Sequence, residues 1–352
     1  MKNFLICWKI FMQHYNILLT GGGTGGHLAI VRSIKEELLK RDIHPFYIGS
    51  ESGQDRSWFE KDNDFADKLF LSTRGVVNQK GIDKLYSISQ IFKAMLQVRN
   101  FMKVHKIEAV LSVGGFSAAP ASFAAILTNI PLFIHEQNAV SGRLNQLLKP
   151  FSKHFFSSYG DETVDYPVSE NFFKTARIRS EIKRVIFLGG SQGAKAINDF
   201  ALQLAPELKK QGIGIIHQTG KIDYERINDA YKELNIEADV FAFDKEIHLH
   251  IAKADLAVSR AGASTLWELT AAQIPTLFIP YPYAAGDHQY YNARHHVDMN
   301  AGWVIRQNML KPDIFWNILE TDIESISKKL RLMINPHGAN SVVNTIIDSI
   351  KD

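Results

Sequence analysis

The chain has 352 residues, more than one average domain needs and enough for two. Hydrophobic residues make up 45% of the sequence and charged residues 22%, an ordinary balance for a globular protein, and the net charge of +3 is too small to indicate a nucleic acid as partner. The single cysteine, Cys7, excludes an intramolecular disulfide, and no zinc-type spacing of Cys and His is present.

Residues 1–13 form an N-terminal extension to which we assign no role. Phe4 to Trp8 are apolar, but Lys9 follows them and no small-residue cleavage site is present, so the segment does not match a signal peptide. No apolar run in the chain reaches the roughly 20 residues of a membrane-spanning helix. The sequence therefore predicts a protein without a membrane span.

The first half alternates between strand-like and helix-like segments. Apolar runs predict strands at residues 16–20, 45–49, 109–113 and 132–135. After the first of them, Ile30, Ile34 and Leu38 recur at helical spacing and predict a helix over 28–41. A series of this kind predicts a parallel sheet with right-handed crossovers.

The second half repeats this arrangement. Strands are predicted at 184–188, 214–217, 240–243, 256–259 and 276–279, and helices at 194–210, 314–333 and 340–350. The stretch around Tyr166-Pro167 has no clean period and predicts a linker. We expect an N-terminal domain at 14–160, a linker at 161–182, a C-terminal domain at 183–335 and a last helix, 336–352, that can pack back on the N-terminal domain.

Each half opens with a strand, a glycine loop and a helix, and the loops are Gly21–Gly26 and Gly189–Gly193. Backbone N–H groups in such a turn, together with the positive end of the following helix dipole, suit a diphosphate. The first loop is neither the dinucleotide pattern nor a P-loop, and one glycine loop alone can also be a tight turn for helix–sheet packing. Two such loops predict a ligand clamped between two domains.

His27 follows the first loop and lies in the first turn of the expected helix. A helix N-terminus disfavours the imidazolium ion, so this histidine is expected to be neutral and able to accept a proton as a general base. The alternative is a polar residue in the wall of the cleft.

Six peptides, in order along nearly the whole chain, resemble the MurG family of bacterial transferases. They are GGTGGH (22–27), GGFSAAP (114–120), HEQN (135–138), GGSQGA (189–194), RAGASTLWE (260–268) and DHQYYNA (287–293). One of these peptides alone would mean little, but six in order are highly specific.

The resemblance implies an α/β protein of the GT-B fold, in which two facing Rossmann-like, doubly wound parallel-sheet domains enclose a deep cleft. It implies UDP-N-acetylglucosamine (UDP-GlcNAc) as donor and lipid I, the undecaprenyl-diphosphate-linked N-acetylmuramyl-pentapeptide, as acceptor. Inversion at the anomeric carbon gives lipid II for peptidoglycan synthesis. The resemblance further implies a peripheral protein at the cytoplasmic face of the inner membrane, without a cofactor.

The donor contacts of the family are carried over residue by residue. The matching residues are Thr24, Gly25, Gly26, Asn138, Ser191, Ala263, Ser264, Thr265, Leu266, Trp267, Glu268 and Gln289. Ser191 corresponds to a serine that binds phosphate, and Asn138 and Gln289 to residues that contact the sugar. Glu268 corresponds to a glutamate that accepts both ribose hydroxyls, as a carboxylate can. The uracil is expected near residues 243–247.

Further residues are expected close to the reacting groups. The acceptor site is expected to include Gly115, Phe116 and Ser117. Glu136 is a second candidate for the base, with orientation of its loop as the alternative role, and His288 stands beside Gln289 where the family often has another glutamine.

Three positions depart from the family pattern. Ile30 replaces a proline, Trp267 is bulky where smaller residues are common, and Ser169 replaces the arginine of a linker motif that reads Asp165-Tyr166-Pro167-Val168-Ser169 here. That arginine is expected to assist the diphosphate. Candidates for the missing charge are Arg177, Lys195 and Arg260.

Two segments bear on metals and membranes. Asp62-Asn63-Asp64 has the form of the metal-binding D-x-D signature but does not follow a strand, so we interpret it as a solvated surface segment and predict no obligatory metal.

Residues 74–106 contain seven basic residues and one acid, interleaved with apolar ones. This pattern suits a surface resting on anionic lipid, or an ordinary helix with an apolar core face and solvated lysines.

Two other functions fit parts of the sequence. A UDP-GlcNAc 2-epimerase shares the two-domain design but needs no acceptor and leaves the basic apolar segment unexplained. A non-enzymatic scaffold at the membrane is indicated only by the loss of the linker arginine at Ser169.

Overall fold

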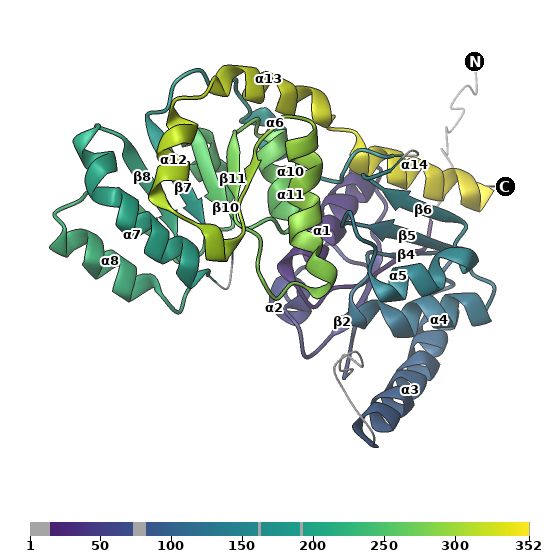
Figure 1. Cartoon of the computed structure of the whole chain (residues 1–352). Coiled ribbons are helices and arrows are strands. Elements are labelled where there is room, and N and C mark those ends of the chain that lie inside the picture. Colours follow the sequence, from purple (N-terminus) through teal and green to yellow (C-terminus); the bar gives the residue numbers. More distant parts are fainter. Residues whose placement is uncertain (1–14, 73–81, 161–162, 191–192, 352) are drawn as a thin grey trace, which may run out of the picture.

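The computed structural model describes residues 15–72, 82–160, 163–190 and 193–351, so the extension 1–13 lies outside the described residues. The chain forms two lobes, each built on a six-stranded sheet flanked by helices (Figure 1). In the first strand, Ile17 and Leu19 pack into one hydrophobic core and Leu18 into the core on the opposite face. Burial on both faces explains why the central strands are continuous apolar runs.

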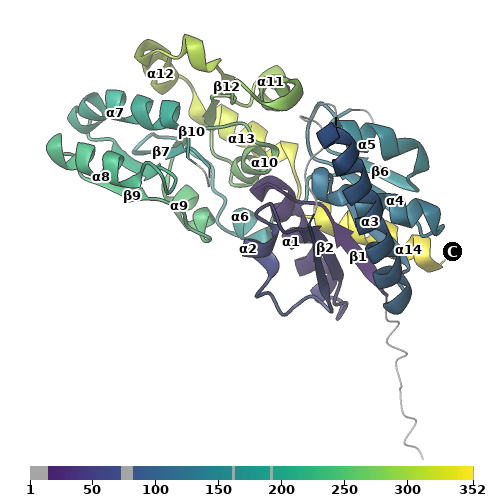
Figure 2. The ribbon, with the colours of Figure 1, turned by 90° about the horizontal axis from the view of Figure 1, so that it is seen from below.

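The N-terminal lobe contains six strands and five α-helices among its described residues. The strands are β1 (Ile17–Thr20), β2 (Phe46–Ser50), β3 (Lys68–Leu71), β4 (Ala109–Ser112), β5 (Leu132–Glu136) and β6 (His154–Ser157). The helices are α1 (Gly25–Leu39), α2 (Asp55–Phe59), α3 (Ile82–Val104), α4 (Ala119–Leu127) and α5 (Arg143–Leu148). Helix α3 lies on the underside of this lobe in Figure 1 and faces the viewer in Figure 2.

The rest of the chain forms the C-terminal lobe, the two crossings between the lobes and a last helix that lies against the N-terminal lobe. The strands are β7 (Arg184–Leu188), β8 (Gly214–Gln218), β9 (Ala238–Phe241), β10 (Leu256–Ser259), β11 (Thr276–Phe278) and β12 (Trp303–Val304). The helices are α6 (Glu170–Lys174), α7 (Lys195–Lys210), α8 (Tyr224–Glu233), α9 (Ile247–Lys253), α10 (Ala263–Ala271), α11 (His288–Asp298), α12 (Pro312–Leu319), α13 (Ile323–Met333) and α14 (Gly338–Lys351).

The strand order places both glycine loops at equivalent positions. The sheets have the orders β3-β2-β1-β4-β5-β6 and β12-β11-β10-β7-β8-β9, with every described pair parallel. In each sheet the order reverses at the first strand of the lobe, β1 or β7, and the glycine loop follows that strand. Doubly wound sheets bind their ligands beyond the carboxyl ends of the strands at this reversal.

Several predicted elements need correction. Helix α1 begins at Gly25, three residues before its predicted start, because the end of the glycine loop forms its first turn, and β9 lies two residues earlier than predicted. The single helix predicted over 314–333 is wrong, since the chain forms α12 and α13 with a break between them. Asp322 caps α13 by accepting a hydrogen bond from the Ser325 N–H at 3.1 Å.

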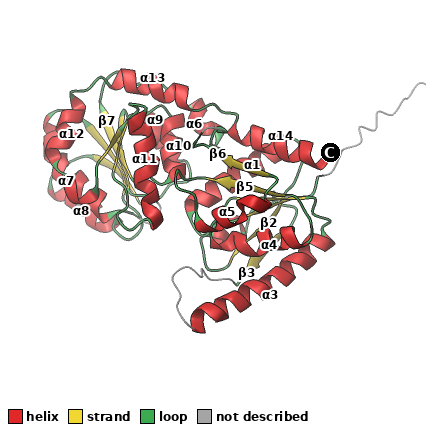
Figure 3. Cartoon of the chain, turned by 45° about the vertical axis from the view of Figure 1, so that its right-hand side comes forward, coloured by secondary structure: helices red, strands yellow, loops and turns green. Residues whose placement is uncertain are grey.

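The last helix, α14, lies against the N-terminal lobe, where it contacts α1 (Figure 3). Asn340 Nδ2 donates to Glu37 Oε1 at 3.0 Å, and Val343 is fully buried. The chain therefore passes between the lobes twice. These two crossings lie side by side, because the Asn335 N–H donates to Asp165 Oδ1 at 2.9 Å.

Candidate functional site

The first glycine loop lies at the carboxyl end of β1. Gly21 and Gly23 have φ angles of +119° and +84°, a region that favours glycine. The Gly22 N–H donates to the Gly114 carbonyl at 3.3 Å, so the loop lies directly against the glycine pair that follows β4. Two of the motifs recognised in the sequence are therefore neighbours in the fold.

A buried carboxylate holds the first glycine loop from its other side. Asp55 Oδ2 accepts from the Gly23 N–H at 2.6 Å, and Oδ1 accepts from the Ser50 N–H at 2.9 Å and the Tyr47 hydroxyl at 3.1 Å. Burial, followed by the nearby Asp55, holds the pKa of Tyr47 well above its usual range, so this hydroxyl keeps its proton. Asp55 was not recognised in the sequence because it belongs to no motif, and only the position of α2 places it beside the loop.

His27 lies in the first turn of α1. Burial, and then His288, lower the pKa of His27 to about 4, so the imidazole is neutral at neutral pH. Its Nδ1 lies 2.8 Å from Thr24 Oγ1. A threonine hydroxyl can donate or accept, so the contact is compatible with both tautomers, and the one in which Nδ1 donates leaves Nε2 free to accept a proton.

A second histidine borders the site. His135 is fully buried, and neither ring nitrogen has a hydrogen-bond partner among the described residues. Burial, followed by His27, lowers the pKa of His135 to about 3. Its ring meets the edge of the Tyr166 ring at 5.6 Å between centroids. His135 is therefore a second buried imidazole that is neutral at neutral pH.

Both carboxylate oxygens of Glu136 accept hydrogen bonds from residues of its own loop. Oε1 accepts from the Asn138 N–H at 2.9 Å, and Oε2 accepts from the Gly142 N–H and Asn145 Nδ2, both at 2.9 Å. The side chain is almost completely buried. A proton acceptor for catalysis needs a free lone pair facing the substrate, so this geometry favours the orienting role over the role of base.

The expected acceptor residues pack against the first glycine loop. A Cβ on Gly115, whose φ is +79°, would lie 2.4 Å from the Gly22 carbonyl oxygen, so the close approach requires glycine. The Phe116 ring covers Gly23, and Ser117 is fully buried. The motif is thus placed beside the donor loop, and its contact with the acceptor stays a prediction.

The second glycine loop follows β7. Gly190 and Gly193 both have φ of +79°, and a Cβ on Gly193 would lie 2.5 Å from the Thr219 carbonyl oxygen. Helix α7 begins directly after the loop, at Lys195, and points its amino end toward it. Ser191 lies outside the described residues, so its phosphate contact stays a prediction. The segment expected near the uracil, 243–247, joins β9 to α9 in this lobe.

The predicted nucleoside-binding segment, Ala263–Glu268, forms the first turns of α10, which contacts α1 across the cleft. Ser264 Oγ donates to the Gly26 carbonyl at 2.8 Å and lies 3.0 Å from the Tyr166 hydroxyl. Trp267 stacks on Tyr166 with 5.8 Å between ring centroids and 18° between planes. The bulky Trp267 and the tyrosine of the altered linker motif are thus packing partners.

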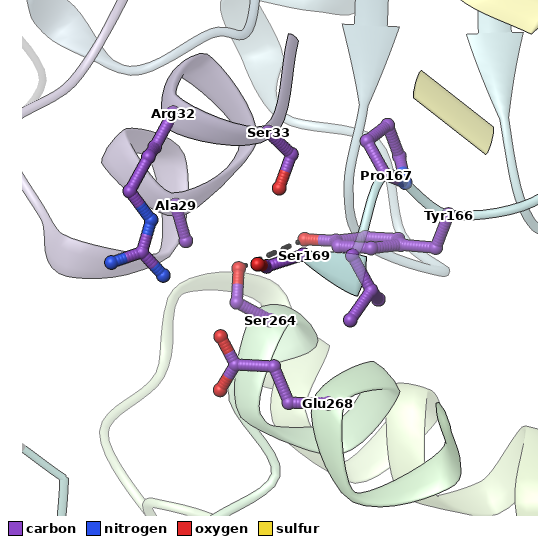
Figure 4. Close-up of a pocket in the computed structure, with 9 residues that line it drawn as sticks. Ala29, Arg32, Ser33, Tyr166, Pro167, Ser169, Ser264 and Glu268 are labelled. Carbon is purple, nitrogen blue, oxygen red and sulfur yellow. Dashed lines mark hydrogen bonds between the residues drawn. The ribbon is translucent and has the colours of Figure 1, made fainter. Parts of the chain in front are cut away.

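A small pocket lies where α1, the linker and α10 meet (Figure 4). Its lining residues are Ala29, Arg32, Ser33, Tyr166, Pro167, Val168, Ser169, Ser264 and Glu268. Burial raises the pKa of Glu268, and Arg32 lowers it by a smaller amount. The lining side chains lie so close together that the pocket has no room even for a water molecule, whereas typical ligand pockets enclose roughly 300–1,000 Å³. A nucleotide sugar therefore requires the lobes to separate further.

Of the two residues predicted to contact the sugar, Asn138 reaches across the cleft to Asn292 of α11, whereas Gln289 is bonded within its own lobe. Asn292 Oδ1 accepts from the Ala139 N–H at 2.8 Å, and Asn292 Nδ2 donates to Asn138 Oδ1 at 3.1 Å. Gln289 Oε1 accepts from the Tyr281 N–H at 2.9 Å within its own lobe. Hydrogen bonds of this kind contribute only about 0.5–1.5 kcal/mol each, so a ligand can replace them.

The three cations considered as substitutes for the linker arginine are engaged elsewhere. Arg260 donates to the carbonyls of Ile279 and Pro280 at 2.9 and 3.1 Å. Arg177 forms an ion pair with Asp255. The remaining candidate, Lys195, is 75% exposed in its side chain and pairs with Asp199 at 2.6 Å.

The D-x-D segment lies at the surface as predicted, with Asn63 and Asp64 exposed and Asp62 half-buried. Asp62 Oδ2 and Asp64 Oδ2 both accept from the ammonium group of Lys35, at 2.6 and 3.0 Å. Lys35 is itself buried. Among the described residues no group of three or more His, Cys, Asp or Glu side chains is arranged to hold a metal ion.

Comparison with known proteins gives matches along both lobes. The glycosyltransferase family 28 N-terminal domain matches residues 17–157, and the family 28 C-terminal domain matches residues 184–346. The chain is 54% identical over 334 residues to the UDP-N-acetylglucosamine–N-acetylmuramyl-(pentapeptide) pyrophosphoryl-undecaprenol N-acetylglucosamine transferase of Wolinella succinogenes, covering 94% of this chain and 99% of that relative. The transferase of the same name from Campylobacter fetus is 52% identical over 332 residues, with 94% and 99% coverage. The crystal structure of MurG from Acinetobacter baumannii has a TM-score of 0.78 at 26% identity and covers 95% of this chain and 99% of its own.

Proposed function

Because this chain belongs to the MurG family of N-acetylglucosamine transferases, we propose that the cleft between its lobes holds both substrates. We also propose that the residues described above carry out the transfer. The chain is a UDP-GlcNAc-dependent glycosyltransferase that converts lipid I to lipid II in peptidoglycan synthesis. The family, the GT-B fold and the activity predicted from the sequence are confirmed.

One observation carries the assignment of the site: residues predicted to contact the donor come from both lobes and meet in one cleft. Ser264 of α10 contacts Gly26 of the first glycine loop. Asn138 contacts α11, the helix that contains Gln289. A ligand entering between these residues exchanges the contacts between the lobes for contacts with itself.

The reaction is an in-line displacement at C1 of the sugar. The acceptor hydroxyl oxygen forms a bond to C1 while the bond from C1 to the diphosphate oxygen breaks, and the hydroxyl proton passes to Nε2 of His27. The diphosphate leaves with the bonding electron pair. Backbone N–H groups of the second glycine loop and the amino end of α7, together with Ser191, are proposed to stabilise its charge. No metal or cofactor is assigned a role.

The transfer is tested with labelled UDP-GlcNAc and a short-chain lipid I analogue in the presence of EDTA. We expect UDP release that depends on the acceptor and is unchanged by the chelator. Epimerised sugar without acceptor would indicate the epimerase, and absence of turnover with intact vesicle binding would indicate the scaffold. A rate that falls more than tenfold in EDTA would contradict a reaction without metal.

We also propose that helix α3 carries a membrane-contacting surface on the cytoplasmic side of the inner membrane. The basic surface consists of Phe92, Lys93, Leu96, Arg99, Lys103 and Val104. Phe92, Leu96 and Val104 are 58%, 49% and 65% exposed, while Val98 and Met102 on the same helix are buried in the core. Exposed apolar groups between cations are the pattern of an interfacial helix. Residues 74–81 of the predicted segment lie outside the described residues, and no described helix is both long and apolar enough to span a membrane.

Neutralising two cations of the basic surface should weaken membrane binding. Each Lys or Arg near an anionic surface contributes about 1 kcal/mol, so Arg99→Gln with Lys103→Gln should lower partitioning onto phosphatidylglycerol vesicles about 30-fold. The matched control changes Lys209 and Lys210, two exposed lysines of α7, to Gln and should leave partitioning unchanged. Equal loss in both double variants would mean that net charge alone attracts the protein to the vesicle.

A further inference from the structure

A guanidinium group reaches the pocket that Ser169 lines, although the sequence gives it no special place. Arg32 belongs to α1, on the N-terminal side of the cleft. Figure 4 shows its guanidinium and the carboxylate of Glu268 pointing into the same space beside Ser264. The pocket therefore has a cation from one lobe and a carboxylate from the other, at the position where the linker has lost its own cation.

The donors of Arg32 are poorly used in this structure. Its Nε is buried without a hydrogen-bond partner among the described residues. The ion pair formed with Glu36 is long, at 3.8 Å from Nε to Oε1, beyond hydrogen-bond distance. The guanidinium lies 5.6 Å from the centre of the Trp58 ring, a cation–π contact that does not occupy its N–H groups.

The chemistry of the pocket fits a nucleoside diphosphate. Glu268 offers carboxylate oxygens, which accept hydrogen bonds from ribose hydroxyls. Arg32 offers planar N–H donors, which bind phosphate oxygens with two parallel hydrogen bonds. Within the described part of the chain no ion pair joins the two side chains, so each remains available for a ligand placed between them.

We propose that Arg32 binds the diphosphate of the nucleotide sugar and supplies the positive charge that Ser169 lacks. The inference rests on the proposed function, because it requires the nucleotide sugar to enter this cleft. Arg32 and Glu268 lie on opposite lobes, so one nucleotide bridges them. Binding of the donor thereby exchanges direct contacts between the lobes for contacts of both lobes with one nucleotide.

The test compares UDP with uridine, which keeps the ribose and lacks the phosphates. By titration calorimetry, Arg32→Ala should weaken UDP binding about tenfold, the value of one charge-assisted hydrogen bond, and change uridine binding less than twofold. Arg32→Lys keeps the charge but not the planar, two-pronged donor geometry. Its UDP affinity should therefore lie between those of the unaltered chain and Arg32→Ala. Adding Ser169→Arg to Arg32→Ala should restore most of the lost UDP affinity, because it returns the cation from the other wall of the pocket.

The control is Arg331→Ala, which removes an exposed arginine of α13 and the same net charge. Unchanged UDP affinity in Arg32→Ala would overturn the proposal, and so would equal weakening of UDP and uridine, which indicates a structural role beside Trp58. A lower melting temperature in Arg32→Ala without rescue by Ser169→Arg would lead to the same conclusion. If the unaltered chain bound neither UDP nor UDP-GlcNAc, the proposed function itself would fail.

Discussion

Replacing His27 by alanine is expected to lower turnover by about 10²- to 10⁴-fold, the contribution of a positioned general base. The reason is geometric and electrostatic, since the imidazole is neutral in the cleft and Thr24 holds its Nδ1. The measurement is kcat with a lipid I analogue at saturating donor. UDP affinity should change less than twofold, because the histidine acts on the acceptor proton. A loss of turnover below tenfold would assign the base to another group.

Two controls separate the base from its surroundings. Thr24→Val removes the partner of Nδ1 while keeping the shape of the side chain, and should lower turnover by a smaller factor than His27→Ala. His44→Ala removes an exposed histidine of the same lobe and should leave turnover unchanged.

The pH dependence gives an independent check. The base works when it is unprotonated, so activity is present above its pKa and is lost as the pH falls through it. With the pKa of His27 lowered to about 4, kcat/KM should be level from pH 7 to pH 5 and fall only near pH 4. An acid limb near pH 6.5, the ordinary value for histidine, would show that the free protein does not keep this imidazole desolvated.

Replacing Glu268 by alanine is expected to raise the donor KM about 10²-fold and to leave the acceptor KM nearly unchanged. A carboxylate that accepts two hydroxyl hydrogen bonds contributes about 1.5–3 kcal/mol for each. The position supports this role, because Glu268 lies in the pocket between α10 and the linker. Steady-state kinetics with each substrate varied in turn measures both constants, and an unchanged donor KM would remove the ribose role.

A ligand lacking one hydroxyl sharpens this test. The unaltered chain should prefer UDP to 2′-deoxy-UDP, and the preference should shrink in Glu268→Ala, since the lost hydroxyl no longer has its partner. Glu233→Ala, which removes an exposed glutamate of α8 in the same lobe, is the matched control, because it takes away the same charge outside the site. A preference that survives in Glu268→Ala would locate the ribose contact elsewhere.

The fold was predictable from the sequence where strands are buried on both faces. The predictions for β7 and β10 coincide with the structure because continuous apolar runs leave little choice of boundary. The strands outside the predicted set, β3, β6 and β12, all lie at sheet edges, where burial is partial and the run is short or polar. The prediction of one continuous helix over 314–333 was wrong because apolar residues keep helical spacing on both sides of the break, so the cap at Asp322 was not recognised.

The site was predictable where residues follow strands at the reversal of each sheet. His27 and the glycine loops belong to such positions, and the structure places them after β1 and β7 as predicted. Asp55 and Arg32 were not predictable, since each is a single charged residue on a helix, a pattern that usually indicates a solvated face. The positions of these two side chains depend on packing between elements that are distant in the sequence. Such packing leaves no regular spacing of residues that could be recognised in one sequence.

The side-by-side passages of the chain at Asp165 and Asn335 act as a double-stranded hinge. A single tether would let the lobes swivel in any direction, whereas two adjacent tethers leave mainly one axis of rotation. Points near that axis move little for a given angle. The pocket wall at Tyr166 and Ser169 therefore keeps its shape during opening, while contacts farther along the cleft separate in proportion to their distance from the axis.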